Sequence, residues 1–241
     1  MCGRFALILP PEAVRAFFQY AEQPNFPSRA NISPTQPVGI VRMDAPAGGP
    51  RGRHFALMRW GFLPGFVKDP KDFPLVINAR SETVSTKPSF RAATIRRRCI
   101  FVADAYYEWQ RSGGPKVKGA PPPRPFLFRR ADGMPMALAG LWETWTGPNG
   151  EEVDTACILT CAANGPVSAI HDRMPVILEP ETFDLWLDCS DHETAPAAQA
   201  LMRTAGDDVL EFFEIGPAIN KSSNEGVELQ TPVRAAGGSL F

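Results

Sequence analysis

The sequence lacks the residue patterns that mark several common kinds of site. Its five cysteines include no Cys-x-x-Cys pair and it has only three histidines, which argues against a disulfide framework and against a structural zinc site. It contains neither a Gly-x-Gly-x-x-Gly motif nor a Walker phosphate loop. No apolar run is long enough to span a membrane, and the run at residues 5–9 is too short and too early for a signal peptide. We therefore expect a cytoplasmic protein with reduced thiols and no metal site.

Positive charge is scarce in the second half of the chain. Residues 131–241 contain 4 Lys and Arg against 18 Asp and Glu, whereas residues 1–130 contain 21 against 8. The basic half is rich in arginine, whose planar guanidinium suits phosphate groups. This asymmetry has two interpretations, which the sequence leaves open. The basic half could form a face that binds nucleic acid, or the two halves could neutralise each other in the fold.

The periodicity of apolar residues predicts more strands than helices. Strands are expected at residues 38–43, 55–60, 75–77, 99–105, 126–128, 136–142, 155–162, 176–178 and 210–215, and short helices at 11–19, 182–188 and 195–204. Residues 111–125, rich in Gly, Pro and Lys, are expected to form a hairpin loop. Strands and helices do not alternate, which favours an α+β fold. We predict a single domain in which mainly antiparallel sheets form a barrel-like core flanked by short helices.

The first five residues, Met-Cys-Gly-Arg-Phe, carry unusual chemistry. If Met1 is removed, Cys2 presents an α-amine and a thiol on adjacent carbons. The pKa of such an amine is about 8 and that of a free thiol about 8.5, so both groups are partly available as nucleophiles at neutral pH. Such a 1,2-aminothiol condenses with an aldehyde to an imine and then closes to a thiazolidine. The alternative is that Cys2 is an ordinary buried small residue.

Three later polar residues are also candidates for a site. Asn78 follows a short apolar run, Glu108 lies among aromatic residues, and His171 lies at the edge of an element beside Asp172 and Arg173. Burial among aromatic rings can make a carboxyl group a proton donor near neutral pH, and histidine carries protons in that range. Taken alone, Glu108 could equally face solvent on an alternating strand, and His171 could be structural.

Six motifs in order make this chain similar to the SRAP family of abasic-site-processing proteins. They are residues 1–5 (MCGRF), 31–34 (NISP), 60–64 (WGFLP), 77–83 (INARSET), 107–109 (YEW) and 171–175 (HDRMP). The resemblance extends from the N-terminus to about residue 226. It implies an SRAP domain at residues 1–226 and a C-terminal tail at 227–241.

The resemblance also implies a mechanism. The substrate is an abasic site in single-stranded DNA, whose opened sugar presents an aldehyde. Cys2, with Met1 removed, forms a Schiff base through its amine and then a thiazolidine through its thiol. Glu108 matches the glutamate that shuttles protons around the amine, His171 the histidine that assists opening of the sugar, and Asn78 the asparagine that orients the sugar and the amine.

The DNA contacts are implied in the same way. Arg4 and Arg80 would hold phosphates, Asn31, Pro34 and Thr160 would line the site, and Trp60 and Phe66 would form a wedge beside the lesion. Phe66-Val67 stands where the family usually has tryptophan.

No cofactor is implied by the resemblance. The protein is expected to act as a monomer, associated with the nucleoid during DNA damage in an SOS response, with strand cleavage by β-elimination and N-terminal autoproteolysis as further activities.

Two other functions fit part of this pattern. An N-terminal-nucleophile hydrolase or amidotransferase would also use a processed N-terminal cysteine, but it would attack an amide with the thiol. A non-catalytic single-strand binder would use the arginines and aromatic rings alone.

Overall fold

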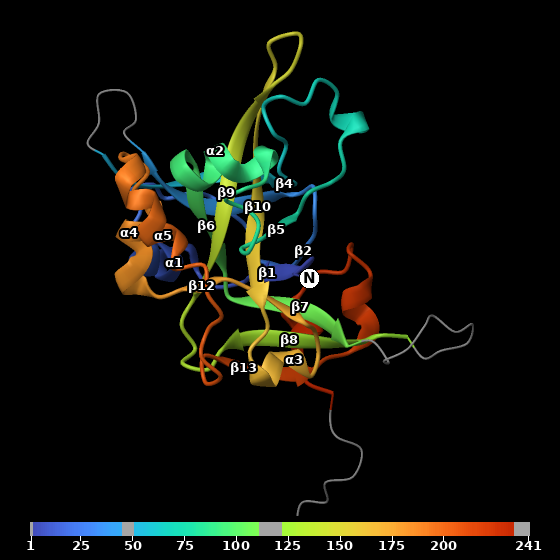
Figure 1. Cartoon of the computed structure of the whole chain (residues 1–241). Coiled ribbons are helices and arrows are strands. Elements are labelled where there is room, and N and C mark those ends of the chain that lie inside the picture. The colour runs from blue at the N-terminus through green and yellow to red at the C-terminus, as the bar shows by residue number, and fades with distance from the viewer. Residues whose placement is uncertain (1, 45–50, 111–121, 234–241) are drawn as a thin grey trace, which may run out of the picture.

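The computed structural model describes residues 2–44, 51–110 and 122–233, and shows two β-sheets around one main core (Figure 1). The first sheet is antiparallel, and its strand order is β13, β8, β7, β1, β2. These strands span Leu210–Glu214 (β13), Arg124–Arg130 (β8), Ala105–Gln110 (β7), Phe5–Leu7 (β1) and Arg29–Ile32 (β2). Because β1 has a partner on each side, the start of the chain lies inside this sheet rather than at its edge.

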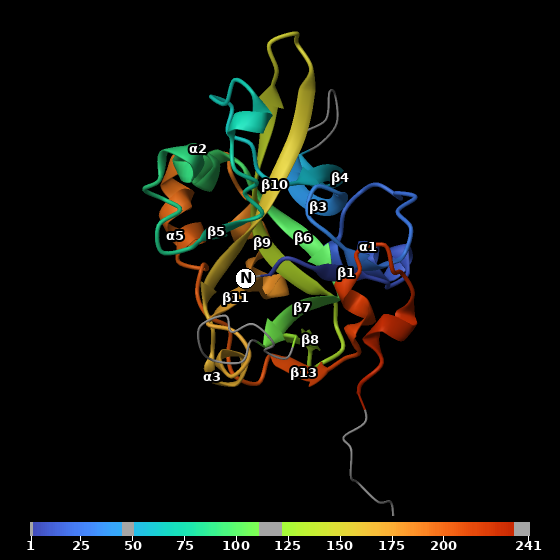
Figure 2. The same cartoon turned by 90° about the vertical axis from the view of Figure 1, so that its right-hand side faces the viewer.

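The second sheet closes on itself. Its order is β11 (Arg173–Pro175), β10 (Glu152–Ala162), β4 (Gly52–Trp60), β3 (Pro37–Asp44), β6 (Arg98–Ala103), β9 (Met136–Thr146) and β12 (Ile177–Leu178), with β5 (Asn78–Arg80) beside β10. A further pairing of β10 with β9 joins β10, β4, β3, β6 and β9 into a closed ring. In Figure 2 the long β9–β10 pair extends from the top of the molecule down to the level of β11, above β8 and β13. The predicted barrel-like core is thus confirmed, although β10 also makes parallel pairings with β4 and β5.

The helices are short. They span Pro11–Phe18 (α1), Pro88–Arg96 (α2), Gly165–Ser168 (α3), Phe183–Leu187 (α4) and Ala195–Gln199 (α5), with 3-10 turns at Pro70–Asp72, Pro180–Thr182, His192–Thr194, Pro217–Asn220 (η4) and Val227–Gln230 (η5). The predicted helix at 195–204 ends early, at Gln199. The α+β class is confirmed. Among the described residues, no helix is long and apolar enough to cross a membrane.

The chain changes sheets at Asp104. The expected single strand at 99–105 is in fact β6 followed by β7, which belongs to the other sheet. One carboxylate oxygen of Asp104 accepts hydrogen bonds from the backbone N–H groups of Ile8 (2.5 Å) and Leu9 (2.9 Å). These bonds hold the end of β1 against the corner. The predicted hairpin loop does join β7 to β8, an antiparallel pair, but residues 111–121 lie outside the described residues.

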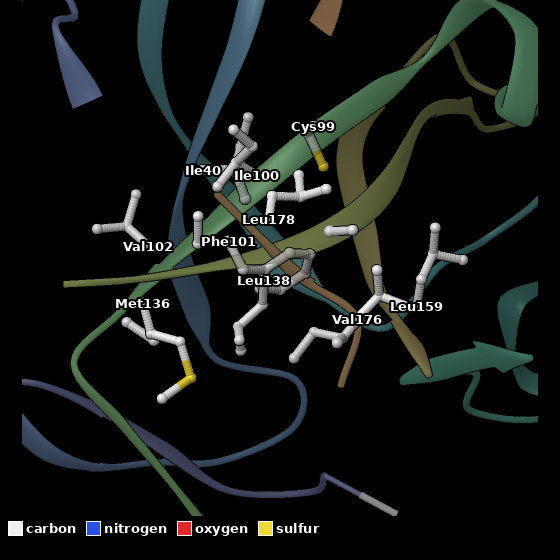
Figure 3. Close-up of a cluster of buried hydrophobic side chains, with 14 of the residues drawn as sticks. Ile40, Cys99, Ile100, Phe101, Val102, Met136, Leu138, Leu159, Val176 and Leu178 are labelled. Carbon is white, nitrogen blue, oxygen red and sulfur yellow. The ribbon is translucent and has the colours of Figure 1, made fainter. Parts of the chain in front are cut away.

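Apolar side chains from the closed ring of strands fill its interior. Figure 3 shows Ile40, Phe101, Leu138, Leu159 and Val176 pointing into this cluster. All five are buried. Buried apolar side chains therefore occupy the interior of the ring. A site for polar chemistry is expected outside it, in the space between the two sheets.

A second, smaller core covers the outer face of the first sheet. Tyr107 and Leu127 on the sheet pack with Ile219 and Leu229 from the C-terminal segment. Since Leu229 in η5 belongs to this cluster, the packing continues beyond residue 226. The boundary between a domain at 1–226 and a tail at 227–241 stays a prediction, and residues 234–241 lie outside the described chain.

Candidate active site

Cys2 lies between the two sheets with no exposed surface. It lies three residues before the start of β1, and the hydrogen bond from the Tyr107 N–H to the Arg4 carbonyl (2.9 Å) holds the intervening chain against β7. In Figure 1, β5 lies on one side of the start of β1 and β7 on the other. The pairing of β1 on both edges thus limits where the segment that carries Cys2 can lie.

Asn78 holds Cys2 from the second sheet. Its Nδ2 donates a hydrogen bond to the Cys2 carbonyl at 2.9 Å. The Oδ1 of the same amide is buried and has no hydrogen-bond partner within the described residues. β5 positions Asn78 by pairing with β10, where Asn78 lies opposite Ile158. The Asn78 amide thus orients the Cys2 backbone through its N–H, and its oxygen can accept a hydrogen bond from a donor nearby.

Glu108 approaches Cys2 from the first sheet. It is 3% exposed and lies on the inner face of β7, since Tyr107 and Trp109 on either side face the outer core. Burial raises the pKa of the Cys2 thiol, and the negative charge of Glu108 raises that pKa further. The carboxylate is therefore close enough to the sulfur to interact with it electrostatically. Asn78 and Glu108 flank Cys2 from opposite sheets.

His171 follows α3 and precedes β11. α3 is capped by Asn164, whose side-chain oxygen accepts a hydrogen bond from the Val167 N–H (3.1 Å). The His171 Nδ1 lies 3.0 Å from the Arg173 backbone N–H, which donates a hydrogen bond to it. An Asp172 carboxylate oxygen lies 3.0 Å from the same ring nitrogen.

Hydrogen bonds tie the segment that carries His171 to both sheets. Gln110 at the end of β7 donates to the Ala169 carbonyl (2.8 Å). In the second sheet, Arg173 donates to the Thr160 carbonyl (2.5 Å) and pairs with both carboxylate oxygens of Glu82 (2.5 and 2.9 Å). Arg173 belongs to the His-Asp-Arg motif, but the sequence did not predict its structural role. That role depends on the β10–β11 pairing, in which Arg173 lies opposite Ala162, and the motif alone does not show this pairing.

Comparison with known proteins identifies the family. The family model described as "SOS response associated peptidase (SRAP)" matches residues 1–222. The chain belongs to the SRAP family. The abasic site processing protein YoqW of Bacillus subtilis is 34% identical over 233 residues, which are 95% of this chain and 98% of that protein. The abasic site processing protein YedK of Escherichia coli is 31% identical, over 97% of this chain and 100% of that protein.

Solved structures agree with the fold of this SRAP chain. A crystal structure of a protein from Bacteroides thetaiotaomicron superposes with a TM-score of 0.80 at 21% identity, covering 96% of this chain and 100% of the other. A protein from Bordetella bronchiseptica gives 0.73 at 27% identity, covering 89% and 100%.

Three residues predicted to contact DNA in this SRAP chain are instead fully buried. Trp60 donates its indole N–H to the Ile77 carbonyl (2.9 Å) and packs edge-on against Phe5, 5.2 Å between ring centroids. Asn31 and Thr160 likewise have no exposed surface. The expectation that Trp60 forms part of a wedge does not fit this placement, because a ring in the core cannot stack on a base.

Arg4 and Asn31 lie together on the outer side of the first sheet. Arg4 donates to the Asn31 side-chain oxygen (2.6 Å) and to the Ile219 carbonyl (3.0 Å). The Asn31 amide in turn donates to the carbonyls of Lys221 (3.1 Å) and Asn224 (2.9 Å). In this SRAP chain the pair therefore anchors the C-terminal segment, a role that the sequence did not suggest. Burial lowers the pKa of the Arg4 guanidinium.

The other predicted contacts are accessible. Phe66 is 63% exposed on the loop between β4 and β5, with Phe73 6.4 Å away between ring centroids. Arg80 is exposed at the end of β5, and Pro34 is half-buried after β2. These three residues retain the surface that a contact with DNA requires.

The charge asymmetry is only partly neutralised within the fold. Several arginines of the basic half pair with acids of the other half, as in Arg53–Asp184, Arg97–Glu143 and Arg129–Glu211. Other cations make no ion pair within the described part of the chain, and seven of these lie between residues 59 and 96: Arg59, Lys68, Lys71, Arg80, Lys87, Arg91 and Arg96. All seven are exposed except Arg59, which is half-buried. This segment, which includes Arg80, therefore carries positive charge that the acidic half does not neutralise.

Proposed function

We propose that this chain processes abasic sites in single-stranded DNA by capturing them covalently at Cys2. One observation carries the proposal: Cys2 is held at its carbonyl by Asn78 from one sheet and faces Glu108 from the other. An ordinary buried cysteine needs neither neighbour. Family membership and relatives that are themselves abasic site processing proteins support the same function.

The reaction begins at the amine of Cys2 after Met1 has been removed. The amine attacks the aldehyde of the opened sugar, and loss of water gives a Schiff base. Glu108 takes a proton from the attacking amine and returns it to the departing hydroxyl. His171 assists opening of the sugar ring. The free Oδ1 of Asn78 accepts a hydrogen bond from the amine and orients it.

The thiol then completes the capture. Its sulfur attacks the imine carbon, and the thiazolidine that results links protein and DNA stably. From the Schiff base, β-elimination would cleave the strand, which accounts for a lyase side activity. An N-terminal amine beside a carboxylate could also support autoproteolysis, the activity implied by the description of the family as peptidases.

The DNA strand is held by phosphate contacts. Arg80 and the unpaired cations Lys68, Lys71, Lys87 and Arg91 supply positive charge near β5, and phosphate contacts dominate the affinity of proteins for DNA. Phe66 offers an exposed ring on which a base can stack. We expect the protein to act as a monomer in the cytoplasm, without a cofactor.

Intact mass spectrometry tests this function. The untagged protein is mixed with a single-stranded oligonucleotide that contains one abasic site, and with an undamaged oligonucleotide of the same sequence. A heat-stable adduct is expected with the abasic strand alone, and the unreacted protein should lack the mass of Met1.

Two variants complete the test. Cys2→Ala should form no heat-stable adduct, and an added N-terminal residue should abolish capture as completely. The proposal fails if the wild-type protein forms no adduct, or if Cys2→Ala forms one equally well. Binding of both oligonucleotides with equal affinity and no adduct would indicate a non-catalytic single-strand binder.

A further inference from the structure

Tyr106 carries a hydroxyl group that the fold leaves without a partner. The side chain has no exposed surface, and its oxygen makes no hydrogen bond within the described residues. Buried hydroxyl groups are nearly always hydrogen-bonded, because water that they lose on folding must be replaced. A buried hydroxyl group without a hydrogen-bond partner therefore suggests a functional role.

The neighbouring tyrosine shows what an ordinary buried hydroxyl does in this strand. Tyr107 faces the opposite side of β7, donates to the Ala30 carbonyl at 2.6 Å and accepts a hydrogen bond from Gln230 at 3.0 Å. Its hydroxyl is thus fully used in fixing the outer core. The two tyrosines lie on opposite faces of β7 and differ in their hydrogen-bond partners. We therefore expect them to have different functions.

The strand position of Tyr106 places its side chain on the same face as the reacting groups. On β7 it lies two residues before Glu108, on the same inner face, and it is directly opposite Phe5 of β1. Its ring stacks on Phe128 with 4.8 Å between centroids and 9° between planes, which holds the ring in place. It belongs to the same buried cluster as Cys2.

Electrostatics agree with this placement. The pKa of the Tyr106 hydroxyl is raised, first by burial and then by the charges of Cys2, Glu108 and Cys161, in that order. The Cys2 sulfur is therefore the ionisable group whose charge affects this hydroxyl most. A donor at this point would offset the effects of burial and of Glu108, which both disfavour the Cys2 thiolate.

We propose that Tyr106 is a positioning residue for the Cys2 sulfur, donating a hydrogen bond to it while the thiazolidine ring closes. The inference rests on the proposed capture of abasic sites. In the closing step the S–H bond breaks and a C–S bond forms at the imine carbon. The π electrons of the C=N bond move to nitrogen, which receives the proton lost by sulfur. Tyr106 keeps its own proton and stabilises the charge on sulfur during the transfer.

The test separates the two chemical steps in Tyr106→Phe. Borohydride reduction traps the Schiff base, and heat resistance measures the closed ring. We expect imine formation at the wild-type rate and ring closure slowed about tenfold or more, the effect of losing a hydrogen bond to a charged group. Trapped imine should accumulate in the variant.

Tyr107→Phe is the matched control, since it makes the same substitution on the opposite face. It should lower the melting temperature and leave both steps unchanged, whereas Tyr106→Phe should keep the wild-type melting temperature or exceed it. If Tyr106→Phe closes the ring at the wild-type rate, or slows both steps equally, the inference is wrong and the capture mechanism stands. If the wild-type protein forms no adduct at all, both fail.

Discussion

Asn78 makes the one hydrogen bond that joins the Cys2 backbone to the second sheet within the described chain. In Asn78→Ala this bond is removed, and so is the buried oxygen that is available to the amine. We expect the rate of heat-stable adduct formation to fall about tenfold to a hundredfold, since a small misplacement of reacting groups has effects of that size. Time courses on denaturing gels with an abasic oligonucleotide measure this rate.

Asn78→Asp separates the two functions of the amide. It keeps the shape and an oxygen, but it removes the N–H that binds the Cys2 carbonyl and adds a charge near Glu108. A rate as low as that of Asn78→Ala would show that the donor matters. Wild-type rates in both variants would remove Asn78 from the mechanism.

Glu108→Gln is expected to make the Cys2 thiol more reactive toward alkylation and crosslinking slower. The carboxylate raises the pKa of the thiol, so its removal should lower that pKa and shift the pH dependence of thiol alkylation toward lower pH. The crosslinking rate should fall, because the amide cannot shuttle protons. Peptide mass spectrometry of alkylated Cys2 at several pH values and adduct time courses measure the two effects. Slower alkylation together with slower crosslinking would point to general damage to the site.

At the scale of single residues, the sequence predicted which polar groups lie together better than it predicted which residues are exposed. Cys2 and Asn78 lie in contact, and Glu108 beside them, because rare polar residues in specific motifs reflect chemistry. Trp60 and Thr160 lie in equally specific motifs and are nevertheless buried. Which way a strand residue faces depends on the sheet that pairs with it, and no short motif contains that information.

At the scale of elements, the corner at Asp104 is the most sensitive connection in the fold. Its carboxylate accepts hydrogen bonds from both the Ile8 and the Leu9 N–H groups, so Asp104→Ala would leave two half-buried donors without their acceptor. We expect it to lower the free energy of unfolding by about 1–3 kcal/mol, because hydrogen bonds to a charged group are lost and water can replace only part of them.

Chemical denaturation measures this decrease. Asp104→Asn keeps an acceptor oxygen and should lower the free energy of unfolding less than Asp104→Ala does. The paired carboxylate of Asp132, exposed in a turn beside Arg130, provides the control, because Asp132→Ala should change the free energy of unfolding by less than about 1 kcal/mol.

The strands and their pairing differ in how far they could be predicted. Alternating or continuous apolar residues predicted β3, β4, β9 and β10 close to their actual positions. The expected strand before Asn78 lies three residues too early, since β5 begins at Asn78 itself. The closure of β9 on β10 and the parallel pairing of β5 join segments far apart in the sequence, and local periodicity contains nothing about such partners.

At the scale of the whole molecule, ion pairs between the two halves leave the cations of residues 68–91 available to DNA. Replacing Lys87 and Arg91 together by alanine should weaken binding to any single strand. The slope of log affinity against log salt should become shallower by about 0.7 for each phosphate that the protein no longer neutralises, the value for single strands. Fluorescence anisotropy at several salt concentrations measures the slope. Replacing the paired Arg124 and Arg129 should change it less.

The closed ring of strands also bears on the alternative enzyme class. An N-terminal-nucleophile hydrolase requires sheets layered between helices, whereas the described helices here have at most nine residues and none covers a layered pair of sheets. The architecture therefore favours aldehyde capture over amide hydrolysis at Cys2. Absence of ammonia release from glutamine would agree with this.

The burial of Cys2 has a consequence for the timing of maturation. An aminopeptidase needs an extended, accessible chain end, but here the second residue is enclosed between two sheets. β1 cannot be enclosed before its partner β7 at Ala105–Gln110 has been synthesised. At about 5–20 residues per second, translation allows roughly 5–20 seconds before then. If capture requires the Cys2 amine, Met1 has to be removed before β1 is enclosed, and a molecule that misses this interval folds with its amine still blocked.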